Sequence, residues 1–347
     1  FRNIQINSYI EKMRKSWEAY HGTFYSDSHE ITYGGEQGEL VNLAVNHYRN
    51  LAQHMLVMVT SSRPAFQCRA VNTDRKSMIQ ADLGNGLLDY YMREKRLERD
   101  LKRATEYAIV LGSGFVKLEW NATKGEIYDY YPIDESLIVE EDLEGNKYDG
   151  DGNVLKEFPI YEGDVDFKTL SPFDVVFDPT KENPDLHDWV LCRSFINRYD
   201  LIAKYPEYED KILGLESKDY QMRKRISVTP YDITHDIPIY EFYHKRTEAL
   251  PQGRYMAYLD SDIVLQDAPM PYRSLPVHRI AGGEILGTPY GYTGMFDLIP
   301  LQDALNSLYS TALTNNNAIG VQNILNPQGN NIKVNQLEGG LNFIEYN

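Results

Sequence analysis

The spacing of apolar residues changes at Gly112, and this change constrains the fold more than any other feature of the chain. Over residues 78–111 apolar side chains recur every three or four positions, which predicts one long amphipathic helix. From Gly114 the stretch GFVKLEWN alternates apolar and polar residues, as half-buried β-strands do. Because glycine readily adopts the left-handed conformation that ends many helices, the helix is expected to stop at Gly112.

The same patterns place two helices before this one and a series of strands after it. Residues 5–20 and 40–59 carry apolar residues at helical spacing, and Pro64 ends any continuation of the second helix. A turn at Lys124-Gly125 leads into EIYDYYPI, which predicts a β-hairpin with the strand before it. Further strands are expected at 165–170, 173–177, 189–196, 238–246, 254–259 and 263–266, with a short helix at 198–205. Helices and strands segregated along the chain predict an α+β fold rather than a doubly wound α/β sheet.

The segment GYTGMFDLIPLQDALNSLYSTALTNNN, residues 291–317, predicts a helix with almost no charge. Only Asp297 and Asp303 carry charge in it. Since a surface helix ordinarily has a charged outer face, this helix is expected to face something other than open water. Its apolar row consists of Leu298, Leu301, Leu305, Leu308, Ala312 and Leu313, and its polar face consists of Gln302, Asn306, Ser310, Thr314 and Asn317.

The amino-acid composition limits the classes of protein to which this chain can belong. The 347 residues include 35 Lys and Arg and 51 Asp and Glu, and the net charge of −16 disfavours a protein whose main task is to grip DNA phosphates. The longest apolar run, Met55–Val59, is far shorter than a membrane span, so we expect no membrane partner. Cys68 and Cys192 are expected to be separate reduced thiols. The chain begins at Phe1 and stops within a strand-like FIEYN, so we expect a longer protein that continues at both ends.

No complete signature of catalysis or cofactor binding occurs in the sequence. Residues 142–157 resemble a calcium loop starting at Asp149, but Val154 and Ile160 stand where the loop needs glycine and glutamate. A surface hairpin is the better interpretation, because Asp-Gly and Gly-Asn form turns. GGEILGTPYGYTG lacks the Gly-Lys-Ser/Thr of a phosphate-binding loop. We therefore expect a protein with no cofactor and no metal, and not an enzyme.

Basic residues crowd the outer face of the helix predicted at 78–111. They include Arg93, Arg96, Arg99 and Arg103, and two acidic residues lie among them. One interpretation is a solvated face with pairs four residues apart, such as Glu98 with Lys102. The other is a face that meets an acidic neighbouring subunit.

Several segments, in this order, resemble the portal proteins of tailed bacteriophages, the rings through which DNA enters and leaves the capsid. RKSWEAYHG is similar to the family's opening helix, and VTSSRPAF to its arginine-proline strand. TEYAIVLGSGFVKLEWN, TLSPFDVVFDPT and IYEFYHKR resemble the helix, turn and strands that follow in the family. The segment at 291–317 resembles the helix called the stem. The order and spacing of these segments carry the resemblance, which spans most of the chain.

The resemblance implies an architecture and a function. Residues 1–290 would form the wing, 291–318 the stem helix and 319–347 part of a small β-rich clip. The family's second stem helix, tunnel loop and crown would lie beyond residue 347. The chain would be one of twelve subunits of a ring at a capsid vertex of the virion, made in the host cytoplasm. Its partners would be the terminase motor, the capsid protein, a tail adaptor and double-stranded DNA that passes without specific binding.

In such a ring, stem helices of neighbouring subunits lie side by side. The resemblance implies that the apolar row buries against the partner stem helix and the next subunit. It also implies that the polar face contacts a neighbour or lines the channel. We expect Leu305→Asp to prevent assembly and Asn306→Asp to be tolerated. A closed ring needs two different faces on each subunit, for which the basic residues at 93–103 and the acidic stretch 139–151 are candidates.

Two other functions stay open on the sequence. One is a different structural protein of the virion, such as a tail adaptor or a baseplate component. The other is a metal-dependent nuclease, because Asp260 and Asp262 flank a turn and paired carboxylates can hold a catalytic metal ion.

Overall fold

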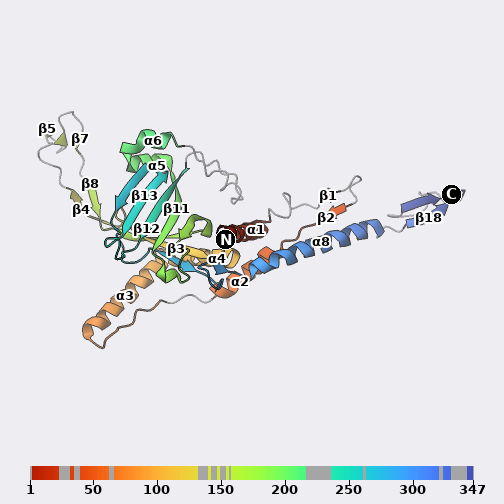
Figure 1. Ribbon diagram of the computed structural model, residues 1–347, viewed down its shortest axis with the longest axis horizontal. Coiled ribbons are helices and arrows are strands. Elements are labelled where there is room, and N and C mark those ends of the chain that lie inside the picture. Colours follow the sequence, from red (N-terminus) through yellow and green to blue (C-terminus); the bar gives the residue numbers. More distant parts are fainter. Residues whose placement is uncertain are drawn as a thin grey trace.

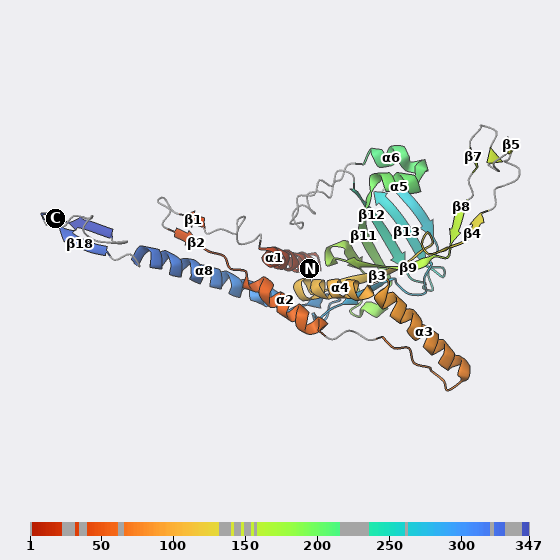
Figure 2. The ribbon, with the colours of Figure 1, turned by 180° about the vertical axis from the view of Figure 1, so that it is seen from behind.

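Helices and strands occupy separate parts of this α+β protein, as the segregated sequence pattern predicts (Figure 1). The computed structural model describes residues 2–22, 32–34, 40–61, 66–131, 140–141, 147–148, 154–155, 158–215, 236–260, 263–319, 323–329 and 342–346. Within these residues, helices pack together at one side of two antiparallel sheets, and two long helices leave the body in different directions (Figures 1 and 2).

The helical core brings together four segments that are far apart in the sequence. They are α1 (Arg2–His21), α2 (His47–Thr60), α4 (Leu97–Leu111) and the first turns of α8 (Met295–Ile319). Their buried side chains include Tyr9, Met13, Ala19, Tyr48, Ala52, Val110, Leu111, Met295, Phe296 and Ile299. The helix predicted at 5–20 is confirmed by α1, and burying its apolar stripe is what stabilises it here.

The helix predicted at 40–59 begins only at His47. Leu40–Asn42 instead forms strand β2, which pairs with β1 (Thr32–Gly34), and residues 43–46 carry no regular structure. Asn46 ends this extended segment, because its side chain accepts a hydrogen bond from the Arg49 N–H and caps α2. The prediction of the first seven residues was wrong because apolar spacing alone does not show where the backbone N–H groups are bonded.

The single helix predicted at 78–111 is two helices, α3 (Arg75–Arg93) and α4. Arg96 lies between them in the left-handed conformation with φ 54°, which interrupts the helical hydrogen bonding. Lys95 forms an ion pair with Asp164, and Tyr91 packs edge-on against Phe167, so contacts to a strand hold the bend. The predicted stop at Gly112 is confirmed, since this residue has φ 85° and donates its N–H to the Ala108 carbonyl.

Two antiparallel sheets hold eight of the described strands, including all those of six residues or more. The larger has the order β10 (Val175–Phe177), β11 (Trp189–Asn197), β12 (Asp236–His244), β13 (Arg254–Asp260) and β14 (Ile263–Ala268). The smaller has the order β15 (Val277–Ile280), β3 (Gly114–Asn121) and β9 (Asp164–Leu170). Helices α5 (Arg198–Lys204) and α6 (Glu209–Leu213) pack on the larger sheet through Leu201 and Ile212. These positions confirm the strands and the short helix predicted between 165 and 266.

The hairpin predicted around Lys124-Gly125 is wrong in its pairing. β3 pairs with β9 on one side and β15 on the other, while β4 (Ile127–Tyr131) pairs with β8 (Phe158–Tyr161). The partner strand β9 lies more than forty residues further along the chain, and Asn121 of β3 lies opposite Asp164 of β9. Partners of this kind are selected by burial of β3 between α4 and the larger sheet, which no local pattern encodes.

The remaining short elements connect these parts. They are β5 (Glu140–Glu141), β6 (Lys147–Tyr148), β7 (Val154–Leu155), η2 (Pro172–Asp174), η3 (Pro184–Leu186), η4 (Pro206–Tyr208), β16 (Gly283–Glu284) and β17 (Gly291–Tyr292). Beyond α8, β18 (Asn323–Pro327) pairs in parallel with β19 (Asn342–Tyr346), at the far end of the molecule from the sheets (Figure 1).

Gly291 lies where two backbones touch, immediately before α8. A Cβ atom on this residue would overlap the carbonyl oxygen of Gly112, and Tyr9 Oη donates a hydrogen bond of 2.8 Å to the Gly291 carbonyl. We expect Gly291→Ala to lower the free energy of unfolding by about 1–3 kcal/mol, because well-packed backbone must move apart. Gly294→Ala is the matched control, since nothing lies within 4 Å of a Cβ there. Urea unfolding followed by circular dichroism compares the two, and equal stabilities would contradict the prediction.

Candidate functional site

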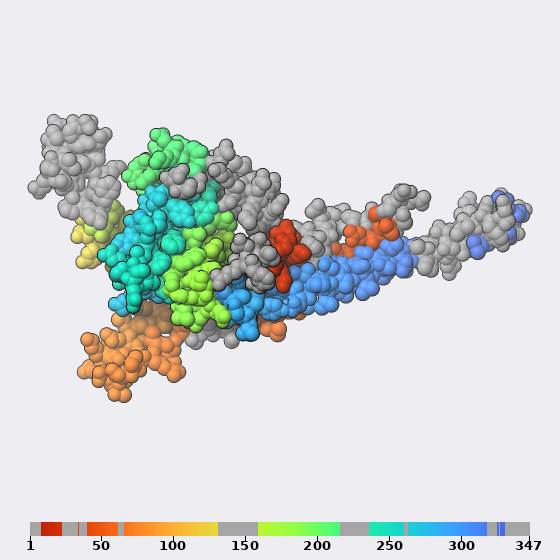
Figure 3. Space-filling model, viewed as in Figure 1, coloured from red at the N-terminus to blue at the C-terminus, as the bar shows by residue number. Residues whose placement is uncertain are grey.

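The long helix α8 is the most distinctive surface element of the protein. Its first turns lie in the core through Met295, Phe296 and Ile299, and the rest extends away from the body (Figure 3, blue). Its 25 residues span about 37 Å at the usual helical rise. A helix that leaves its own core must find other partners for its two faces.

The polar face of α8 is bonded to the extended chain that precedes α2. Backbone N–H groups donate to it as follows: Val41 to Thr314 Oγ1 at 3.0 Å, Leu43 to Ser310 Oγ at 3.0 Å, Val45 to Asn306 Oδ1 at 3.2 Å and Tyr48 to Gln302 Oε1 at 2.9 Å. In return, Gln302 Nε2 donates to the Val45 carbonyl at 2.7 Å. We call Gln302, Asn306, Ser310 and Thr314 the polar ladder.

The spacing of the polar ladder explains why it works. Side chains four residues apart on a helix are separated by about 6 Å along its axis. N–H groups two residues apart on an extended chain point the same way and are separated by about 6.6 Å. The two repeats match over Val41, Leu43 and Val45, and the fourth contact comes from Tyr48 in the first turn of α2. One helix face can therefore satisfy the backbone N–H groups of an adjacent extended segment.

These contacts change the interpretation of the polar face. Gln302 is 3% exposed and Asn306 is 9% exposed, so in the subunit they face residues 41–48 of the same chain. The resemblance had implied contact with a channel or a neighbour, whereas the ladder explains the neutral polar face without either. Asn317 is exposed near the end of the helix. The expected tolerance of Asn306→Asp also changes, because a carboxylate there would be buried.

The apolar row of α8 lies on a different side of the helix and is largely uncovered. Leu301 is 59% exposed, Leu305 38% and Leu308 65%. Ala312 is also exposed, while Leu298 and Leu313 are half-buried and Leu298 packs against the helical core. A row of leucines exposed on a projecting helix is unusual for a surface that remains in water.

The row continues onto α2. His47 Nε2 lies 3.2 Å from Tyr309 Oη, and the two rings are 5.8 Å apart between centroids. Leu51 lies one helical turn beyond His47, and Leu305 one turn before Tyr309. Together with Met58, which is also exposed, these residues extend the uncovered surface across both helices. We call Leu301, Leu305, Leu308, Tyr309, Leu51 and Met58 the apolar patch.

The basic residues predicted as a charge face are divided between two helices. Arg93 is the last residue of α3 and lies 3.9 Å from Asp89, and Arg96 occupies the bend. Arg99 and Arg103 lie on α4, and all four residues are exposed. Of the acidic stretch 139–151, the structure describes only 140–141 and 147–148, so its place opposite a basic face lies outside the described residues.

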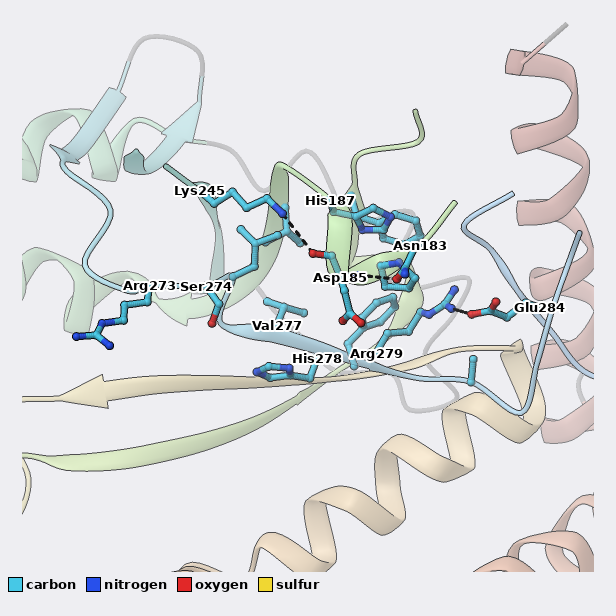
Figure 4. Close-up of a pocket in the computed structure, with 16 residues that line it drawn as sticks. Asn183, Asp185, His187, Lys245, Arg273, Ser274, Val277, His278, Arg279 and Glu284 are labelled. Carbon is cyan, nitrogen blue, oxygen red and sulfur yellow. Dashed lines mark hydrogen bonds and ion pairs between the residues drawn. The ribbon is translucent and has the colours of Figure 1, made fainter. Parts of the chain in front are cut away.

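A cavity with a volume of about 630 Å³ lies between β3, β15 and the η3 turn (Figure 4). Two of its basic side chains are bonded to neighbouring groups. Lys245 Nζ donates to the Asp185 carbonyl at 3.3 Å, and Arg279 pairs with Glu284. His187 stacks on Phe177 at 5.0 Å, and burial lowers the pKa of its imidazole, which favours the neutral ring.

Few of the described residues are suited to binding a metal ion or to acting as reactive thiols. Within them, no group of three or more His, Cys, Asp and Glu is placed to hold a metal ion. Asp262 of the nuclease alternative and most of the calcium-like segment 142–157 lie outside the described residues. Cys68 and Cys192 are both free, as the sequence predicts, and burial raises the pKa of the Cys192 thiol to about 12. No helix in the described part of the chain is long and apolar enough to cross a membrane.

Comparison with protein-family models and with curated proteins finds no match to this chain. The resemblance to portal proteins therefore depends on the sequence segments named above. Among the surfaces of the described residues, the apolar patch on α8 and α2 is the best candidate for an interface, because its large apolar side chains are exposed. This surface suits a protein partner rather than a small substrate, because it is broad, apolar and borne on two helices.

Proposed function

We propose that this chain is a subunit of a portal-like ring, which forms a DNA channel at one capsid vertex of a tailed virus. The observation that carries the proposal is the exposed apolar row Leu301, Leu305 and Leu308 on a helix whose polar face is already bonded to its own subunit. The apolar side of this helix is therefore available to meet another molecule.

The energetics favour association through this row. Burying a leucine side chain that was exposed is worth about 1.5–3 kcal/mol, so three leucines supply a substantial driving force before the costs of association. In a ring, each subunit uses one face toward the next subunit and a different face toward the previous one, and the pattern closes on itself. The same contact is then repeated around the ring, twelve times if the number of subunits follows the family.

The proposed mechanism is geometric rather than catalytic. Stem helices would form the wall around the channel, residues 1–290 the surrounding wing, and residues 319–347 part of the clip that meets the terminase motor and later a tail adaptor. The motor would supply the work of packaging, and the ring would also serve genome ejection. The low charge of α8, with Asp297 and Asp303 as its charged residues, suits a wall along which DNA slides.

Electron microscopy and native mass spectrometry of the full-length protein test the proposal. We expect closed rings with a central hole that admits duplex DNA. A stable monomer at high protein concentration would contradict the proposed function. A closed assembly without an open centre would favour the alternative of another virion component, and magnesium-dependent DNA cleavage lost in Asp260→Ala would favour the nuclease.

The net charge of the chain leads to a second prediction, which concerns the affinity of the ring for DNA. Each subunit carries a net charge of −16, so a ring repels DNA phosphates over most of its surface. We expect non-specific duplex binding weaker than a Kd of roughly 10⁻⁴ M at physiological salt, the weak end of the range for DNA-binding proteins. Fluorescence anisotropy with a labelled duplex at low and physiological salt measures it. Tight binding that weakens steeply with salt would show that basic residues dominate the DNA-facing wall.

A further inference from the structure

Helix α3 stands away from the body of the protein with no covering layer of its own. None of its 19 residues is buried, and it forms the lower projection of the molecule (Figure 3, orange). An isolated helix of this length is only marginally stable in water, since most helical stability comes from packing. The question is what covers α3 in the working protein.

One face of α3 is held by the protein itself. Asn85 Oδ1 accepts a 2.7 Å hydrogen bond from the Cys68 N–H, and Asn85 Nδ2 donates to the Cys68 carbonyl at 3.3 Å. A Cβ atom on Gly84 would lie 2.8 Å from Cys68 Sγ, so only glycine allows this close approach. At the base of the helix, Tyr91 packs edge-on against Phe167 of β9 at 5.7 Å. The direction of α3 is therefore set by specific contacts.

The opposite face carries apolar side chains. Ile79, Leu83, Leu87 and Tyr90 follow one another at spacings of four, four and three residues, which places them on one side of the helix. All four are exposed, and Leu83 is 66% exposed. They lie roughly opposite Asn85 and beside Gly84, Leu88 and Tyr91, which are less exposed. We call these four residues the arm row.

Charge indicates which kind of partner fits. Residues 66–103 contain nine Lys and Arg and six Asp and Glu, a net charge of +3 in a chain of −16, so the rest of the chain carries −19. The projecting region and its base are therefore basic, while most of the chain is acidic. Such a distribution is complementary to a second copy of the same chain.

We propose that α3 is an arm that docks on a neighbouring copy of this chain and buries the arm row there. The inference rests on the proposed function, because a closed ring supplies each subunit with two neighbours. It adds a second contact, in a different part of the subunit from the apolar patch. α3 and α8 leave the body in different directions, so the two contacts can tie neighbouring subunits together at separate places (Figure 2).

Two matched variants of the full-length protein test the arm. Leu83→Glu places a carboxylate in the arm row. Met78→Glu adds the same group to another exposed apolar position, about 140° around the helix axis from Leu83. Leucine, methionine and glutamate all favour helix, so propensity changes little. We expect Leu83→Glu to raise the concentration needed for half-maximal assembly by about tenfold or more, corresponding to the loss of one buried leucine contact. Met78→Glu should assemble like the wild type, and both subunits should keep the wild-type circular dichroism spectrum.

Amide hydrogen exchange supplies an independent readout. We expect the amides of α3 to exchange more slowly in assembled rings than in unassembled Leu305→Asp subunits. Normal rings from Leu83→Glu, with unchanged exchange in α3, would overturn the arm while leaving the proposed function intact, and would assign this face to another partner. A wild-type protein that stays monomeric would instead overturn both.

Discussion

Leu305→Asp is expected to give a folded subunit that no longer forms rings. Leu305 is the least exposed of the three leucines at 38%, and it lies between Leu301 and Leu308 in the row that we propose is buried between subunits. A carboxylate buried there without a partner costs several kcal/mol or must take up a proton. In the isolated subunit the same carboxylate reaches water, so folding should be affected little. The expected effect is loss of rings rather than loss of structure.

The control for this variant comes from the structure. Ser307→Asp adds the same charge two residues along the same helix, which places it about 200° around the helix axis from Leu305. Ser307 is exposed, whereas Asn306 is buried in the polar ladder, so Ser307 is the better control position. Gel filtration, negative-stain microscopy and circular dichroism separate the outcomes. Normal rings from Leu305→Asp would show that the row is not a subunit interface, and unfolding would place Leu305 in the core of the monomer.

Lys117→Met is expected to destabilise the subunit by about 3–5 kcal/mol, as loss of one partner from a buried ion pair does. Lys117 is 1% exposed on β3, and its Nζ lies 2.6 Å from Glu119 and 2.6 Å from Glu241 of β12. The ammonium group also lies 5.6 Å from the centre of the Tyr243 ring. The lysine thereby joins the two sheets, and methionine would leave two carboxylates facing each other without a cation.

A surface pair provides the comparison for Lys117. Lys124 lies 2.8 Å from Asp166 but is half-exposed, so Lys124→Met should cost no more than about 1 kcal/mol. Thermal and urea unfolding of both variants measure the difference. Adding Glu241→Gln to Lys117→Met should recover part of the loss, because one unpaired charge is removed. Equal stabilities of the two single variants would contradict a structural role for the buried cluster.

The same cluster predicts how stability depends on pH. Burial disfavours the charged form of Lys117, but Glu241 and Glu119 outweigh it, and the pKa of the ammonium group is raised above its ordinary value of 10.5. A raised lysine pKa stabilises the folded state at every pH below the ordinary value. This contribution is lost as the pH rises through the folded-state pKa. Unfolding measured above pH 10.5 should show wild type losing stability faster than Lys117→Met.

The candidate site shows how far the sequence alone reaches. The low charge of the 291–317 segment distinguished this helix in the sequence, and four of the six residues of the predicted apolar row are exposed in the subunit. The partner of the polar face was not predicted, because it lies about 260 residues earlier in the chain, at residues 41–48. One sequence signal pointed to this partner. Polar residues at 302, 306, 310 and 314 repeat every four positions, and their spacing along the helix axis matches that of every second N–H group on an extended chain. The arm row on α3 was merged with the face of α4, since the periodicity runs on past the bend.

The local features of this protein follow from its amino-acid sequence alone. Helical spacing predicted α1 and α8, alternation predicted the strands, and Gly112 predicted the stop of α4, since each depends on neighbouring residues and on backbone conformation. Tertiary contacts set the bend at Arg96, the pairing of β3 with β9, and the late start of α2 at His47. In each case, hydrogen bonds and burial between segments distant in the sequence outweighed the local pattern, because an unpaired backbone group costs more than a weak local propensity gains.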